Sequence, residues 1–203
     1  MRGFTLGCAF ALGVFLVSRT SSGGAGPAAE TGSRLTTLYR HDPLRSAISL
    51  ATGEDGRYFE GGYARNRNCD LDFGNNNADA LTIGIETGRK GVLVDLGSTE
   101  ALAKRFGYVE PTGGGQGYAS IHYVGGRLVI TRAVEGTFQP LPEGSQLLSG
   151  SVEGATARAA LGHVYLARLV DSRDPAFELI AKLIVVGHVA GESVTVRWDV
   201  LTR

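Results

Sequence analysis

Three apolar runs near the C-terminal end of the chain constrain its fold more than any other feature. They span residues 161–170, 177–186 and 193–200, and short connectors rich in Asp, Pro, Gly and Ser separate them. Such an arrangement is typical of an antiparallel meander. The middle run is apolar on both faces, which predicts a central strand covered on both sides. The last run alternates, so we expect Trp198 on a buried face and polar residues on a face in water.

Short strands and tight turns are also expected along the rest of the chain. The 203 residues include 30 glycines, a proportion that suits many turns. Gly125-Gly126 is a strong two-residue hairpin signal. We expect strands at 47–51, 57–63, 118–124, 127–133 and 145–152, a second meander at 69–73, 81–85 and 92–96, and either a linker or an edge strand at 34–39.

One short helix is predicted near 98–106. Ser98 can cap its first turn, Glu100 favours the positive end of the helix dipole, and Gly107 is placed to end it. Residues 155–160 fit either one helical turn or the lead-in to the final meander. Long helices do not alternate with the strands, which disfavours a parallel α/β sheet. The sequence therefore predicts a single all-β domain at 30–203, an antiparallel β-sandwich or a jelly-roll-like barrel.

The first 29 residues resemble a secretory signal peptide followed by a small-residue linker. Arg2 precedes an uncharged apolar run at 4–17, which is too short to span a bilayer comfortably, and residues 18–29 offer small side chains for cleavage. A retained N-terminal anchor is the alternative. We expect a secreted, periplasmic or surface protein of bacterial origin, without a transmembrane span in the mature chain. Cys69 would then be its only cysteine, which excludes an internal disulfide.

The charge balance excludes some classes of partner. Twenty basic and twenty acidic residues give a formal net charge of zero. A nucleic-acid-binding protein usually has a clustered basic surface, so we expect no nucleic-acid partner.

A run of oxygen-bearing side chains is the first candidate site. Such side chains at close spacing suit calcium, but the spacing matches no calcium loop and lacks the glutamate of an EF-hand. We favour a solvated strand face followed by a turn over a calcium site, and we expect no other cofactor. The residues concerned are Asp70, Asp72, Asn75, Asn77 and Asp79.

Tyrosines in the middle third are the second candidate site. Tyrosines on a sheet face or loop can stack on sugar rings, although packing in the core and rim explains most aromatic residues in strands. The ligand-binding candidates are Tyr58, Tyr63, Tyr118 and Tyr123.

Catalytic patterns are weak. No two of His41, His122, His163 and His188 have zinc-ligand spacing, and no GxSxG motif occurs. Antiparallel pairing of 161–170 with 177–186 would bring His163 and His188 to the same end of the sheet. The glycine loop 113–117 precedes a predicted strand instead of a helix, so it does not fit a phosphate-binding loop.

These patterns favour an exported, non-enzymatic β domain with a structural role or with a small molecule, glycan or protein as its ligand. One alternative is a secreted hydrolase or carbohydrate-active protein with a site dispersed over several loops. Another is a surface protein that self-associates through a sheet edge.

Overall fold

The final meander forms the centre of the largest sheet. The computed structural model describes residues 33–75, 77–86, 88–106, 118, 120–131, 137–149 and 155–201. The three apolar runs are the antiparallel strands β12 (His163–Asp171), β13 (Glu178–Val189) and β14 (Ser193–Val200). β1 (Arg34–Tyr39) and β7 (Arg89–Ser98) complete a five-stranded sheet in the order β1-β14-β13-β12-β7. The meander is confirmed, and 34–39 is an edge strand.

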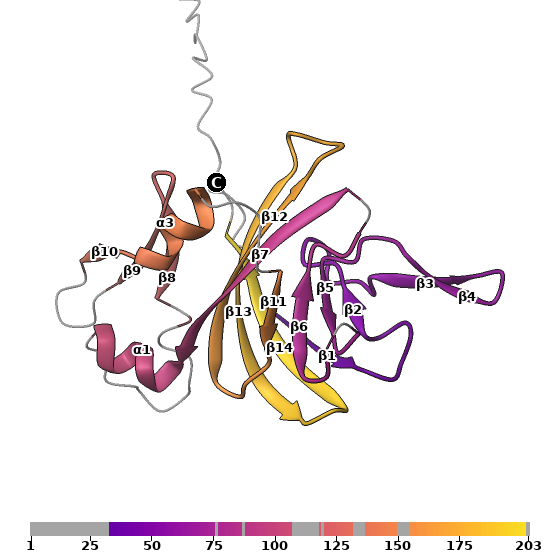
Figure 1. Cartoon of the computed structure of the whole chain (residues 1–203). Coiled ribbons are helices and arrows are strands. Elements are labelled where there is room, and N and C mark those ends of the chain that lie inside the picture. Colours follow the sequence, from indigo (N-terminus) through magenta and orange to yellow (C-terminus); the bar gives the residue numbers. More distant parts are fainter. Residues whose placement is uncertain are drawn as a thin grey trace, which may run out of the picture. The chain divides into compact units, whose positions relative to one another are not determined.

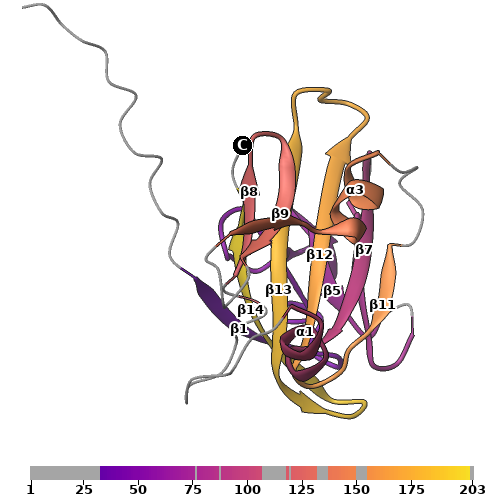
Figure 2. The same cartoon turned by 90° about the vertical axis from the view of Figure 1, so that its left-hand side faces the viewer.

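Strand β13 is buried on both faces, as its two-sided apolar pattern predicts. Leu183 and its neighbours on one face belong to one core cluster, and Ile184 on the other face belongs to a second. In the views of Figures 1 and 2, the five-stranded sheet lies between a layer of strands on one side and a layer of helices and short strands on the other. Each layer buries its apolar side chains against one face of this sheet.

The first core cluster joins the large sheet to a four-stranded sheet. This sheet has the order β11-β6-β5-β2, and its strands are β2 (Ala47–Ile48), β5 (Leu71–Phe73), β6 (Ala80–Ile83) and β11 (Thr156–Arg158). Leu71, Phe73 and Leu81 pack in this cluster with Trp198 of β14. Residues 156–158 thus form a strand of the four-stranded sheet, whereas the sequence had offered one helical turn or a lead-in to the final meander.

The second predicted meander is only half correct. β5 and β6 pair, but β7 pairs with β12 instead of β6. Gly84 adopts a left-handed conformation (φ 71°), and a side chain there would meet the backbone nitrogen of Gly91 at 2.7 Å. The glycine therefore ends β6 and lets the chain cross closely to the other sheet.

The second core cluster lies beneath a small sheet and two helices. The small sheet has the order β10-β9-β8, with strands β8 (Ile121–Val124), β9 (Arg127–Thr131) and β10 (Phe138–Pro140). The helices are α1 (Thr99–Phe106) and α3 (Pro142–Ser149). Leu102 of α1 and Leu147 of α3 are fully buried in this cluster. The hairpin at Gly125-Gly126 and the helix near 98–106 are confirmed.

Helix α3 corrects the strand predicted at 145–152. Pro142 occupies its first turn, where a proline costs no helical hydrogen bond, and Glu143 suits the positive end of the dipole. Gly144 lies so close to β9 that a Cβ would meet Leu128 at 2.5 Å. The described residues therefore contain two short helices rather than one.

A two-stranded ribbon extends from the four-stranded sheet. It consists of β3 (Arg57–Glu60) and β4 (Tyr63–Asn66), joined by Gly61-Gly62. Both glycines have positive φ, as this two-residue turn requires. All four residues of β4 are exposed, and Figure 1 shows the ribbon projecting beyond β2 and β5.

The all-β class is confirmed, because antiparallel sheets dominate the described residues. All of these residues belong to one unit that spans 31–203. The predictions for the signal peptide and for the glycine loop 113–117 lie outside the described residues. No helix within the described part of the chain has the length and apolar character needed to cross a bilayer.

Candidate functional site

Asp70 and Asp72 lie inside the protein, which corrects the prediction of a solvated strand face. Both are 0% exposed. Arg89 donates to the Asp70 carboxylate, which also accepts from the backbone N–H of Leu50 at 2.9 Å. Arg57 donates to Asp72 Oδ2 at 2.9 Å. Two arginines from other segments thus neutralise carboxylates that the alternating pattern had placed in water.

Burial is the largest influence on the pKa values of Asp70 and Asp72. Desolvation raises the pKa of the Asp70 carboxyl, against the opposing charge of Arg89. Desolvation likewise raises the pKa of the Asp72 carboxyl, against Arg57. The neighbouring Cys69 is fully buried, and burial raises the pKa of its thiol to about 12. The two carboxylates therefore hold the β5 region to other segments, because Asp70 binds Arg89 of β7 and Asp72 binds Arg57 of β3.

The five candidate calcium ligands do not converge on one point. Asn75 donates to Asp72 through its backbone at 3.3 Å and through its side-chain amide. Asp79 lies apart from the buried pair and binds His188 and Gly191. Among the residues that the structure describes, no group of three or more acidic, histidine or cysteine side chains is arranged to hold a metal ion.

Asp79 fixes the loop that precedes β6. It is the one described non-glycine residue with positive φ, at 61°. Its Oδ1 accepts from Gly191 N at 2.6 Å and from His188 Nε2 at 3.1 Å, and its carbonyl accepts from Ala159 N at 2.7 Å. The two side-chain bonds hold the pKa of the Asp79 carboxyl below its ordinary value, the bond from Gly191 having the larger effect. A strained residue held by three segments is a feature found at functional sites.

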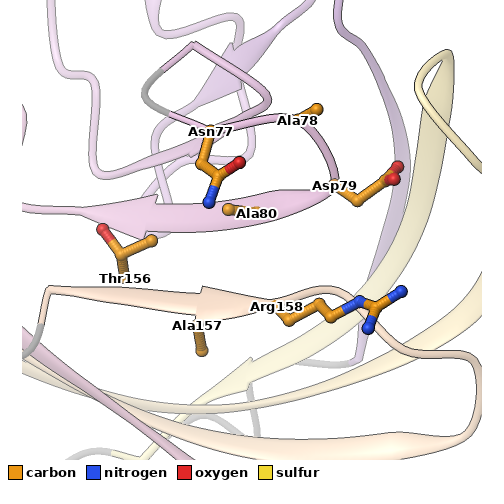
Figure 3. Close-up of a pocket in the computed structure, with 7 residues that line it drawn as sticks. All are labelled: Asn77, Ala78, Asp79, Ala80, Thr156, Ala157 and Arg158. Carbon is orange, nitrogen blue, oxygen red and sulfur yellow. The ribbon is translucent and has the colours of Figure 1, made fainter.

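A polar pocket lies beside this residue, and we call it the Asp79 pocket. It has a volume of about 450 Å³ and is lined by Asn77, Ala78, Asp79, Ala80, Thr156, Ala157 and Arg158. Figure 3 shows the Asn77 amide directed toward Ala80, whereas Asp79 and Arg158 both extend to one end of the pocket. Its walls supply donors and acceptors above a floor of small side chains, which suits a small polar ligand.

A second hollow, the Tyr39 hollow, lies at the end of β1. It has a volume of about 460 Å³ and is lined by Tyr39, His41, Asp42, Arg45 and Glu192. The Arg45 guanidinium lies 4.6 Å from the centre of the Tyr39 ring. Asp42 Oδ1 accepts from the backbone N–H groups of Leu44 and Arg45 at 2.9 and 3.1 Å. Both bonds lower the pKa of the Asp42 carboxyl below its ordinary value, and the bond from Arg45 has the larger effect.

The two hollows lie on either side of one turn. The β13–β14 turn contains Gly191, which binds Asp79, and Glu192, which lines the Tyr39 hollow. The carbonyl of Glu192 also accepts from the backbone N–H of Arg40 at 2.9 Å. This turn therefore joins the edges of both candidate sites.

The four candidate tyrosines are not brought together. Tyr58 and Tyr63 lie on the β3–β4 ribbon, where Arg67 and Arg65 stack on their rings at 4.9 and 5.9 Å. Tyr63 is 70% exposed. The other two, Tyr118 and Tyr123, pack in or against the second core cluster, on the opposite face of the five-stranded sheet.

Tyr118 belongs to a buried polar cluster instead of an open surface. The Lys182 ammonium lies 4.7 Å from its ring centre and donates to the carbonyl of Ile121 at 3.1 Å. Asp199 approaches the same ammonium at 3.5 Å. Burial lowers the pKa of the Lys182 ammonium and raises that of the Tyr118 hydroxyl.

The histidines also lie apart. His163 and His188 are at the same end of the β12–β13 pair, as antiparallel pairing predicts. Each has its own carboxylate, however, because His163 binds Asp95 at 2.9 Å and His188 binds Asp79. They therefore do not share a site.

Sequence patterns missed the Tyr39 hollow, and of the Asp79 pocket they indicated only Asn77 and Asp79, as candidate calcium ligands. Tyr39 and Glu192 become neighbours only because β1 pairs with β14, far along the chain. Arg158 and Thr156 reach the Asn77 loop only through the pairing of β11 with β6. A cluster of aromatic and charged residues at 39–45 was the local signal for the Tyr39 hollow.

We compared the chain with protein families, curated proteins and solved structures. No family model, no curated protein and no solved structure matches the chain.

Proposed function

We propose that this chain is an exported, non-enzymatic β-sandwich domain that binds a small carbohydrate-like ligand in the Tyr39 hollow. The observation that carries the proposal is the combination of an accessible tyrosine ring with three kinds of charged or polar side chain around one hollow. Sugar rings present apolar C–H faces and polar hydroxyl edges. An aromatic ring with adjacent hydrogen-bonding groups complements both.

Four side chains of the hollow have a role in this proposal. Tyr39 is 39% exposed, so a sugar ring can reach it. Arg45, which lies over the Tyr39 ring, supplies donors in a fixed orientation. Asp42 and Glu192 supply carboxylate acceptors for sugar hydroxyls. The volume of about 460 Å³ is within the range of small-ligand pockets.

Binding is tested by thermal shift of the full chain against a panel of mono- and disaccharides. A ligand that binds only the folded state raises the melting temperature by mass action. We expect Tyr39→Ala to abolish that rise and Tyr63→Ala, at an exposed tyrosine of the ribbon, to preserve it. The absence of a rise with every sugar would contradict the proposal. Loss of the rise in Tyr63→Ala alone would move the site to the β3–β4 ribbon.

Export is the second part of the proposal. Its support is the basic start, the apolar run at 4–17 and the small residues that follow. Mass spectrometry of the protein from the medium or periplasm is expected to find a new N-terminus between residues 19 and 31. Recovery of the chain with Met1 intact from the soluble fraction would contradict cleavage.

A further inference from the structure

Strand β1 leaves one edge of the largest sheet open. Sheet edges expose unpaired backbone groups, and proteins usually protect them with short strands, prolines, bulges or charges. Among the strands that the structure describes, β2, β3, β4, β8 and β11 have four residues or fewer, and β10 contains Pro140. β7 has an irregular register opposite Val164 and Tyr165. β1 has six residues and none of these devices.

The one charge in β1 does not protect the edge. Arg34 folds back and donates to the carbonyls of Leu50 and Ala51 at 3.2 and 2.5 Å. The next residue along the strand, Leu35, is 64% exposed. Figure 2 shows β1 on the outer side of β14, at the flank of the described sheet. The edge is thus apolar at its accessible end.

Hydrogen bonds at the end of β1 fix the direction of its free backbone groups. Arg40 N donates to Glu192 O and so points toward β14, whereas Tyr39 N donates to Arg45 O on the other side. Backbone groups of alternate residues in a strand point in opposite directions. Leu35 and Thr37 therefore direct their N–H and C=O groups away from β14. No backbone hydrogen bond from another described residue reaches them.

We propose that this edge binds the same edge of a second copy of the chain. An antiparallel arrangement with its two-fold axis at Thr36 sets Leu35 opposite Thr37 of the other copy, and Thr37 opposite Leu35. Both residues have outward backbone groups, so the two pairs form four hydrogen bonds. Both side chains also lie on the same face of the sheet, so each leucine contacts a threonine across the interface.

The closed end of the edge favours a second copy over a longer peptide. The outward N–H of Tyr39 is already bound by Arg45, and the chain turns back there. A long strand running past Tyr39 would collide with this loop, whereas a second β1 has an open stretch of matching length. The formal net charge of zero removes long-range repulsion between two copies. The interface is small, so the dimer is weak and dependent on concentration.

The test is sedimentation equilibrium of the full chain over a wide concentration range. Leu35→Pro removes an outward N–H while leaving the bonds to β14, and proline is tolerated on edge strands. Leu35→Lys adds a charge to the same edge as a second variant. Each substitution occurs twice in the two-fold interface, so its unfavourable effect on binding is doubled. Either change is therefore expected to weaken the dimer by roughly tenfold or more. Thermal melts confirm that the variants fold.

Val189→Lys is the matched control, because Val189 is 52% exposed on β13, away from the edge. We expect its dimer to match that of the wild type. A wild-type chain that stays monomeric at all concentrations would overturn the proposal. A dimer that survives both Leu35 changes, or one that Val189→Lys abolishes, would also overturn it, since neither would depend on the β1 edge.

Discussion

Asp79 accepts a hydrogen bond of 2.6 Å from the backbone N–H of Gly191, which lies 112 positions later in the chain. The bond connects the loop before β6 to the turn between β13 and β14, and thus joins strand ends of the two sheets. Because Gly191 precedes Glu192, the same bond connects the Asp79 pocket to the wall of the Tyr39 hollow. The arrangement at this end of the molecule therefore depends on the backbone conformation and the carboxylate of one residue.

Three substitutions at Asp79 separate its conformation from its hydrogen bonds. Asparagine tolerates positive φ and keeps a carbonyl acceptor, so Asp79→Asn is expected to be the mildest change. Asp79→Gly relieves the strain but loses the acceptor, and Asp79→Ala loses the acceptor and keeps the strain. We expect the melting temperature to be highest for the wild type and to fall through the asparagine and glycine variants to the alanine variant. An alanine variant as stable as the asparagine variant would show that neither factor matters.

The Asp79 contacts predict a pH dependence of stability. The pKa of Asp79 is lower in the folded chain than its ordinary value of 3.8, because Gly191 and His188 donate to its carboxylate. An acid with a lowered folded pKa stabilises the fold above the unfolded pKa, and this contribution is lost as pH falls through the folded value. The stability advantage of wild type over Asp79→Asn should therefore shrink as pH falls below about 4. Urea melts from pH 5 to pH 3 measure it, and an advantage that grows over this range would contradict this assignment.

Calcium is expected to leave the stability unchanged. Asp70 and Asp72, the two strand carboxylates that would anchor a site, are buried and bound by Arg89 and Arg57. Scanning calorimetry with millimolar calcium, and with a chelator as control, should give the same melting temperature. A calcium-dependent rise of several degrees that Asp72→Asn abolishes would contradict this expectation, since a ligand of the folded state must stabilise it.

The sequence predicted elements whose signals are local. The meander follows from apolar runs and turn residues, and the hairpin at Gly125-Gly126 follows from two adjacent glycines. Asp70 and Asp72 were wrongly predicted to face water, because the alternation of polar and apolar residues reports only the polarity along one strand. Their burial depends on Arg57 and Arg89, which arrive from other segments. A pattern along one strand contains no information about a partner that only the tertiary fold supplies.

The same limit explains the missed sites and the misplaced β7. β7 pairs with β12 and so belongs to the five-stranded sheet. The alternation of polar and apolar residues within 92–96 does not predict which of the two sheets the strand joins. The Tyr39 hollow needs the pairing of β1 with β14, and the Asp79 pocket needs that of β11 with β6. The polar residues of both sites lie at strand ends or in loops, where sequence patterns are weakest.

Trp198 is expected to be essential for stability. Its side chain is 1% exposed in the first core cluster, and its indole N–H donates to the carbonyl of Leu50 at 3.0 Å. Trp198→Ala should reduce the free energy of unfolding by about 3 to 5 kcal/mol because it leaves a large cavity. Trp198→Phe, which retains an aromatic ring but loses the hydrogen bond, should cost less. Blue-shifted emission that acrylamide quenches poorly would report the burial, whereas emission like that of free tryptophan would contradict it.

The N-terminal strand is expected to contribute more to stability than its polar sequence indicates. Leu38 is 1% exposed and packs in the first core cluster, whereas Leu35 on the same strand is 64% exposed. Leu38→Ala should therefore cost about 2 to 5 kcal/mol, as core truncations do. Leu35→Ala should cost within about 0.5 kcal/mol in the monomer, because little is packed around it.

Deletion of residues 30–40 extends this comparison. A linker at 34–39, one of the two alternatives from the sequence, would tolerate such a deletion, since terminal segments with few buried contacts are dispensable. The structure reverses that expectation, because the deletion removes Leu38 and exposes the edge of β14. We expect urea melts of the deleted chain to show a loss at least as large as that of Leu38→Ala. A deleted chain as stable as the wild type would mean that β1 contributes no net stability, and that Leu38 is replaceable in the core.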